Sequence, residues 1–161
     1  MYPVFFFAFA IIASLIHISR TKKRTSAKLS EIILMYLIFF CLGFQGVLAF
    51  MGHAFDANQV ARDIGWPTGS PFQFEVAVAN LGIGVAALLG IFWKKTYWLA
   101  VLITSLISLF GDTYGHFVQM AKGDMSPYNS GIFLYVGDLL IPAIILVVAI
   151  WYFSSNSKAK R

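Results

Sequence analysis

The sequence predicts an all-α bundle of five transmembrane helices, and its composition is the first reason. Apolar residues make up 59% of the 161 positions and charged residues only 12%, with a mean hydropathy of +0.77. An average soluble domain is roughly 45–50% apolar and about 25% charged, so a soluble sphere of this size would not bury so much apolar surface. The composition excludes an ordinary soluble enzyme, a disordered chain and a nucleic-acid-binding domain. It indicates one integral membrane domain over residues 1–161.

Long apolar runs are the second reason for this fold class. A helix needs about 20 apolar residues to cross the ~30 Å hydrocarbon core of a bilayer. Five runs meet this length, at residues 2–19, 31–52, 71–93, 97–120 and 131–153. The first run has no basic segment before it and no small-residue cleavage site after it. We therefore expect a retained first helix rather than a signal peptide.

The distribution of basic residues is the third reason, and it predicts the orientation. Ten of the twelve lie in the first loop, the third loop and the tail, namely Arg20, Lys22, Lys23, Arg24, Lys28, Lys94, Lys95, Lys158, Lys160 and Arg161. Only Arg62 and Lys122 are left for the other side. Because cytoplasmic loops carry an excess of Lys and Arg, we expect the N-terminus outside and the C-terminus in the cytoplasm.

The one long loop, residues 53–70, is expected on the outer side with a short helix at the membrane interface. Asp56 and Gln59 have the spacing of a capping box, and Gly65 is expected to end this helix. Trp66 is then expected at the level of the lipid headgroups. The N-cap and the first and third positions of the next span are expected at Ser70, Pro71 and Gln73.

Several polar residues lie inside the predicted spans, where a charged group costs about 2.5–3.5 kcal/mol. At a rise of ~1.5 Å per residue they reach similar depths in the outer half of the membrane. These residues are Gln45, Glu75, Asn80, Asp112, His116 and Asp138, with His53 at the end of the second span. No Lys or Arg lies within a span to pair with the acids. We therefore expect a polar pocket that binds or carries a cation, a proton or a small polar ligand.

The local spacing of these residues adds three expectations. The fourth span carries polar residues every four positions, at Thr104, Ser108, Asp112 and His116. Asp112 and His116 are close enough to hydrogen-bond to each other. Pro142 lacks an N–H group and is expected to free a backbone carbonyl near Asp138. A stripe of small residues on the third span fits close packing against an internal helix or a second copy of the chain, at Gly82, Ala86 and Gly90.

Other interpretations of the polar residues stay open. Imidazole and carboxylate groups suit a divalent metal such as zinc, manganese or iron, and the candidate ligands are His53, Glu75, Asp112, His116 and Asp138. Such a site would belong to a membrane metalloenzyme. A scaffold or partner subunit would bind no ligand, and Glu75 would only pair with Arg62. Haem held by two outer histidines is the cofactor that the pattern favours least.

Binding is favoured over catalysis, because the sequence contains no nucleophile–base pair and no cofactor motif. The expected partners are the lipid bilayer and a small ligand, with no nucleic acid. The oligomeric state stays open, since the small-residue stripe fits a second copy as well as an internal helix.

Three stretches of the chain carry a resemblance to a known family. They are GWPTGSPFQFE at residues 65–75 continuing to NLG at 80–82, GDTYGH at 111–116, and NSG at 129–131 leading to GDLLIP at 137–142. Through them the chain resembles a family of small prokaryotic membrane proteins of unknown function. The resemblance implies a multi-pass protein of the prokaryotic cytoplasmic membrane and no particular reaction. The signature positions it implies are Trp66, Ser70, Glu75, Asn80, Asp112, His116 and Asp138.

Overall fold

The computed structural model describes residues 2–158, and within them the chain is helical and contains no strand. Five helical segments are long and apolar enough to cross a bilayer: Tyr2–Arg20, Ser26–Phe55, Phe72–Leu89, Thr96–Ala121 and Phe133–Ser157. The five predicted spans are confirmed as helices, with ends that differ by a few residues. Lys160 and Arg161, expected in the basic tail, lie outside the described residues.

The long segments are built from α-helix with two π-helical stretches. The first segment is α1 (Tyr2–Arg20), and the second combines α2 (Ser26–Tyr36), η1 (Leu37–Phe44) and α3 (Gln45–Phe55). The third and fourth are α5 (Phe72–Leu89) and α6 (Thr96–Ala121), and the fifth combines η2 (Phe133–Leu140) and α8 (Ile141–Lys158). Two short helices lie in the connections, α4 (Ala57–Asp63) and α7 (Pro127–Ser130). The sequence predicted α4 but not α7 or the π-helical stretches.

Local contacts explain where the predicted ends were wrong. The second segment begins at Ser26, before its apolar run, because the Thr25 hydroxyl accepts a hydrogen bond from the Lys28 N–H at 3.3 Å and caps the helix. The third segment ends at Leu89 rather than at residue 93. The chain turns there, and Lys95 adopts a positive φ of 60° immediately before α6.

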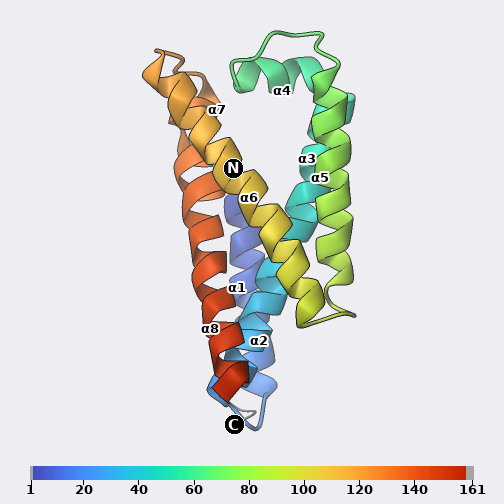
Figure 1. Cartoon of the computed structure of the whole chain (residues 1–161), viewed down its shortest axis with the longest axis vertical. Coiled ribbons are helices and arrows are strands. Elements are labelled where there is room, and N and C mark those ends of the chain that lie inside the picture. The colour runs from blue at the N-terminus through green and yellow to red at the C-terminus, as the bar shows by residue number, and fades with distance from the viewer. Residues whose placement is uncertain (1, 159–161) are drawn as a thin grey trace.

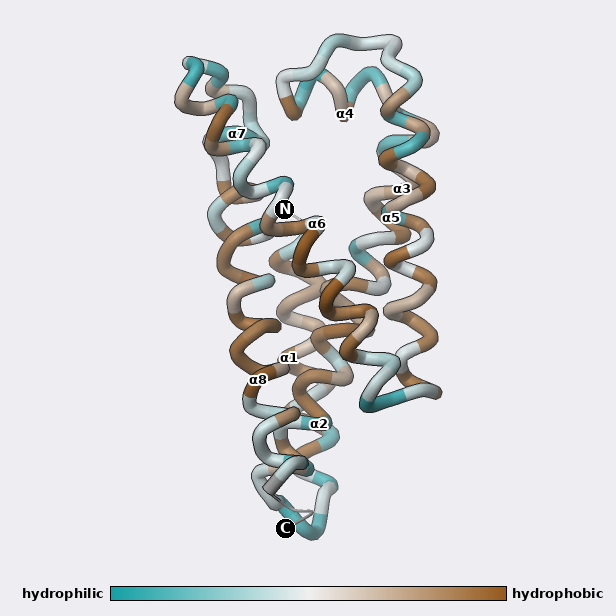
Figure 2. The backbone as a smooth tube through the Cα atoms, viewed as in Figure 1, coloured by the Kyte–Doolittle hydropathy of each residue, from teal (hydrophilic) through white to brown (hydrophobic). Residues whose placement is uncertain are grey.

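The helices are packed together at one end and diverge toward the other (Figure 1). We call the end that holds Arg24, Lys28 and Lys94 the basic end, and the opposite end the α4 end. Near the α4 end, α3 and α5 run side by side while α6 slants away from them toward α7. Figure 2 shows hydrophobic residues along the middle of the long helices and hydrophilic residues at both ends. This distribution is the one expected of helices that cross a bilayer.

The hydrophobic core lies in the half nearer the basic end. Trp98 is fully buried there, and its indole N–H donates a hydrogen bond to the Gly90 carbonyl at 2.7 Å. Buried side chains from four helical elements surround it, including Leu34, Leu37, Ile38, Leu102, Ile145 and Tyr152. Close packing of this kind holds helices together in a bilayer, where lipid is as apolar as the side chains. The core fixes the basic end and leaves the α4 end more open.

Helices α3 and α5 approach each other through glycine. A Cβ atom added to Gly46 would lie 2.8 Å from the Cα atom of Gly84, and one added to Gly84 would lie 2.8 Å from a backbone nitrogen of α3. The predicted small-residue stripe was wrong in one member. Gly82 is exposed and has nothing within 4 Å of its Cβ position, so the contact face of α5 runs through Gly84 instead.

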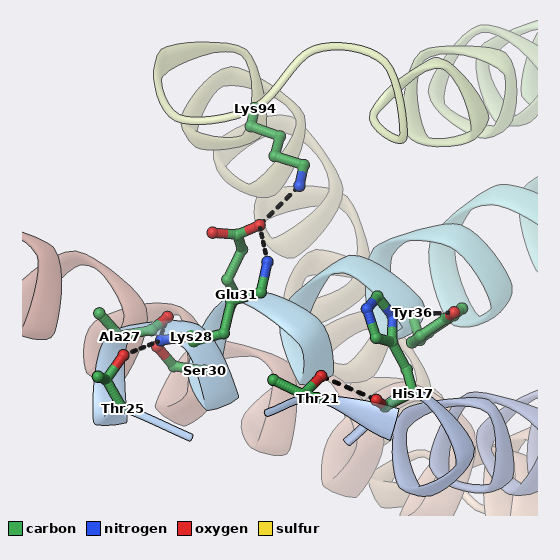
Figure 3. A network of polar contacts seen from close by, with 9 residues as sticks. All are labelled: His17, Thr21, Thr25, Ala27, Lys28, Ser30, Glu31, Tyr36 and Lys94. Atoms are coloured by element: carbon green, nitrogen blue, oxygen red, sulfur yellow. Dashed lines mark hydrogen bonds and ion pairs between the residues drawn. The ribbon is translucent and has the colours of Figure 1, made fainter. Parts of the chain in front are cut away.

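A polar network joins the α5–α6 turn to α2 at the basic end (Figure 3). The Lys94 ammonium lies 2.6 Å from Glu31 Oε1, and Lys28 lies 3.3 Å from the same oxygen. All three side chains are partly exposed. Ion pairs in contact with water contribute only about 0–1 kcal/mol, so this network positions the turn more than it stabilises the fold.

Candidate functional site

A cavity of ≈ 330 Å³ lies in the half of the bundle nearer the α4 end. Its walls come mainly from α3, α5, α6 and η2, and residues in and after α4 also line it. Seven of the polar residues singled out in the sequence line this cavity, namely Gln45, His53, Asn80, Ser108, Asp112, His116 and Asp138. None of the described lining residues is Lys or Arg. The cavity is therefore polar and acidic in one part of its surface.

Glu75 lies away from this cavity. Its side chain is exposed and is not part of the lining, and Arg62 hydrogen-bonds to Gln59 at 2.7 Å instead of pairing with it. Residues two positions apart lie on nearly opposite sides of a helix. Because Gln73 is buried against α3, Glu75 faces outward. For this reason Glu75 does not join the other candidate residues in the cavity, and the alternative in which it pairs with Arg62 does not form either.

His116 connects the cavity to the short helix α7. Its Nδ1 lies 2.6 Å from the Asn129 amide oxygen, and its Nε2 lies 3.8 Å from an Asp138 carboxylate oxygen. An amide oxygen only accepts hydrogen bonds, so Nδ1 carries the hydrogen and Nε2 faces the carboxylate. The spacing would allow a hydrogen bond between His116 and Asp112, but the structure pairs His116 with Asn129 instead. Within residues 2–158 the Asp112 carboxylate has no hydrogen-bond partner in the protein.

Asn129 ties α6 to the segment after α4. It is fully buried, and its amide nitrogen donates to Ser126 Oγ at 2.9 Å and to the Ile64 carbonyl at 3.4 Å. Together with the His116 contact, this side chain joins three segments at the edge of the cavity. Asn129 lies in one of the stretches that carry the family resemblance, but its contact with His116 was not predicted, because a single Asn in a short polar loop has no periodic signal.

We expect Asn129→Leu to lower the free energy of unfolding by about 2 kcal/mol or more. The change leaves the Ile64 carbonyl and His116 Nδ1 without partners, and a buried unpaired polar group costs about 1–3 kcal/mol. Unfolding by SDS in mixed micelles measures the effect. Asn156→Leu is a matched control because Asn156 bonds only to the Tyr152 carbonyl of its own helix. An equal loss in both variants would contradict the bridging role of Asn129.

Asp138 is held through its backbone as well as its side chain. Pro142 has no N–H to donate, and the Thr113 hydroxyl lies 2.6 Å from the Asp138 carbonyl oxygen. This contact agrees with the prediction that Pro142 frees a carbonyl near this acid. Asp138 also lies in the π-helical stretch η2, and π-helical turns are frequent at functional sites.

His53 contributes to the opposite wall of the cavity. Its Nδ1 lies 2.5 Å from the Gln73 amide oxygen, and Gln73 is 2% exposed. Helix α5 has Pro71 as its N-cap, so its predicted start, with Ser70 as the N-cap, was one residue early, and the Gln73 side chain contacts His53. The Ser70 hydroxyl accepts a hydrogen bond from the Phe72 N–H at 3.3 Å, and α5 begins at Phe72.

The α4 segment adds apolar groups to the cavity. Helix α4 ends near the predicted position, but the capping box does not form, because Asp56 caps nothing and Gln59 donates to Asp63 at 2.9 Å. The inner sides of this segment contribute lining residues at Val60, Ile64 and Trp66. Trp66 therefore faces the cavity in part and is 38% exposed.

The loop after α6 packs against the end of the α4 segment. Gly65 has a φ of +76°, and an added Cβ would collide with the Asp124 carboxylate. The Ser126 backbone N–H donates to Asp124 at 3.0 Å, which lowers the pKa of this carboxyl group. A carboxylate and a glycine thus meet where the two sides of the cavity approach each other.

The candidate metal ligands are not gathered into one cluster. Within residues 2–158 no group of three or more His, Cys, Asp or Glu side chains is placed to hold a metal ion. Glu75 lies outside the cavity, and His53 is held by Gln73. The lining offers carboxylates and imidazoles from separate walls instead.

Two buried polar atoms in the cavity lining have no hydrogen-bond partner among the described residues, Gln45 Oε1 and Ser105 Oγ. The sequence pattern selected Thr104 on this helix, but Thr104 is exposed and its hydroxyl bonds to the Ala100 carbonyl. Ser105 is 1% exposed and lines the cavity. Its spacing of seven residues before Asp112 places both on one helix face, which is the signal that would have identified it.

Five long apolar helices around a partly polar cavity suggest the class of multi-pass membrane proteins. Within this class, the chain belongs to a family of unknown function, DUF6790, whose match covers residues 1–158. No curated protein sequence and no solved structure matched the chain.

Proposed function

We propose that the protein spans a prokaryotic cytoplasmic membrane with its basic end inside and its cavity toward the outside. The basic end holds Arg24, Lys28 and Lys94, and the positive-inside rule places such residues in the cytoplasm. An odd number of spans then puts the N-terminus outside and the C-terminus inside.

The cavity in this proposal binds and carries a small organic cation. The supporting observation is its ionisable lining, in which Asp112 and Asp138 supply negative charge and no described residue is Lys or Arg. A cleft with one sign of charge and apolar walls concentrates ions of the opposite sign. The volume of ≈ 330 Å³ lies near the lower end of the ~300–1,000 Å³ range of small-molecule sites.

An organic cation fits this cavity better than a metal ion or a reaction centre. Aliphatic side chains such as Leu48, Ile83 and Leu109 form much of the lining, which suits carbon atoms of a ligand. A nucleophile would need a base within hydrogen-bond reach. The two lining histidines instead contact the amides of Asn129 and Gln73.

The test compares three probes of equal length on the purified protein in a nonionic detergent. We expect isothermal titration calorimetry to give saturable binding of hexylamine, weaker binding of hexanol and no binding of hexanoate. Only the amine combines a positive charge with an apolar chain. Uptake of tetramethylammonium into proteoliposomes then separates a carrier from a protein that only binds. Equal binding of hexanoate, or no binding of any probe, would overturn the proposal, and the second result would support a scaffold subunit.

A further inference from the structure

The two unpartnered polar atoms of the cavity carry information about the ligand. Ser105 is 1% exposed, and neither its Oγ nor Gln45 Oε1 has a partner among the described residues. A buried hydroxyl in a helix commonly donates to the carbonyl four residues earlier. Thr104 and Thr113 on the same helix are placed to do so, at 3.0 and 2.8 Å. The Ser105 hydroxyl makes no such bond and is free to meet a group inside the cavity.

Both atoms lie at a similar depth in the bundle. Ile38 and Trp98 approach Gly90 at one level, since a Cβ on Gly90 would lie 3.4 Å from the first and 3.2 Å from the second. Gln45 and Ser105 each follow that level by seven residues along helical segments that run toward the α4 end, the first mostly through the π-helical stretch η1 and the second through α6. They therefore face the same depth of the cavity from α3 and α6.

The carboxylates lie farther toward the α4 end. Asp112 follows Ser105 by seven residues on α6, which is ~10 Å of helix. Thr113 bonds to the backbone of Asp138, so both acids lie near one level. Between the two levels the lining combines the apolar side chains of Ala49 and Leu109 with the polar side chain of Ser108, and Asn80 lines the cavity from α5. The cavity thus has an acidic part nearer the α4 end and a part farther from that end whose polar groups are all neutral.

From this arrangement we infer that the ligand is an elongated amino alcohol, with an ammonium group near Asp112 and Asp138 and a neutral hydroxyl near Gln45 and Ser105. This inference rests on the proposed function and specifies its substrate class. Gln45 Oε1 only accepts hydrogen bonds, whereas the Ser105 hydroxyl donates and accepts. A ligand hydroxyl satisfies both atoms. A second ammonium would find no carboxylate among the lining residues at that level.

The experiment compares matched pairs of probes, aminohexanol with hexylamine and aminooctanol with octylamine, by titration calorimetry on the detergent-purified full chain. Wild type is expected to bind at least one amino alcohol about 10-fold more tightly than the alkylamine of the same length, as expected for a hydrogen bond that fills otherwise unpaired groups. Ser105→Ala and Gln45→Leu are each expected to reduce this ratio to about 1. Thr104→Ala is the matched control, because its hydroxyl lies outside the cavity and is expected to leave the ratio as in wild type.

The outcomes separate the two proposals. Alkylamine binding without any preference for the amino alcohol would overturn this inference and leave the proposed function in place. A preference that survives both Ser105→Ala and Gln45→Leu would also overturn it, since the hydroxyl would then bind elsewhere. Failure of every amine to bind would overturn both proposals.

Discussion

Gly46→Ala and Gly84→Ala are each expected to lower the free energy of unfolding by about 2 kcal/mol or more. A Cβ at either position meets backbone atoms of the opposite helix at 2.8 Å, and backbone does not rotate aside as a side chain does. Carbon atoms pack best at about 3.5–4.0 Å, so α3 and α5 must separate by about 1 Å. Overpacking of a tight contact costs about 1–3 kcal/mol, and this contact has no flexible partner to absorb it.

Gly82→Ala provides the matched control on the same helix. Gly82 is exposed, and nothing lies within 4 Å of its Cβ position. Alanine has the higher helix propensity by about 1 kcal/mol, so this variant is expected to be as stable as wild type or slightly more stable. Unfolding by SDS in mixed micelles compares the three variants. A similar loss in Gly82→Ala and Gly84→Ala would contradict the helix contact described here.

The same glycine contact positions two walls of the cavity. Helix α3 carries Gln45 and His53, and α5 carries Asn80. Because Gly46 lies next to Gln45 in sequence, a shift of α3 relative to α5 would change the spacing of these polar groups. The close approach of two backbones therefore supports the candidate site as well as the fold.

The helices themselves were predictable from the sequence, because a bilayer requires long apolar runs and these are visible without alignment. Their ends were less predictable, since capping and turn contacts decide them. The hydroxyl of Thr25 extends the second segment, and the turn before Lys95 shortens the third. Hydropathy does not report either effect.

The sequence identified most residues of the candidate site, but it did not identify which side chains hydrogen-bond to each other. Depth along each span identified Asp112, His116 and Asp138, all of which line one cavity. The sequence does not show how each helix is rotated about its own axis. That rotation alone decides that Glu75 faces outward. The partner of His116 was missed because Asn129 comes from a short helix with no apolar period.

The largest effect on ligand binding is expected from the two cavity carboxylates. Hydrogen bonds to charged groups contribute about 1.5–3 kcal/mol, which corresponds to roughly 10–150-fold in affinity. Asp112 has no partner within residues 2–158, so its full charge is free for a ligand. Asp138 has His116 Nε2 at 3.8 Å from one carboxylate oxygen, so the imidazole occupies part of the space around this acid. We therefore expect Asp112→Asn to weaken hexylamine binding about 100-fold and Asp138→Asn about 10-fold.

Asn keeps the shape of Asp, so both variants are expected to fold, and SDS unfolding checks this before titration calorimetry. Glu75→Gln is the matched control, because it removes one acid from the same half of the bundle without touching the cavity lining. It is expected to leave hexylamine affinity within about 2-fold of wild type, since Glu75 does not line the cavity and a charge away from the ligand is largely screened by salt. Equal losses in Glu75→Gln and Asp112→Asn would mean that the overall charge of this half attracts the amine. Direct contact with the ligand requires that Asp112→Asn weakens hexylamine binding more than Asp138→Asn does, and that Glu75→Gln has little effect.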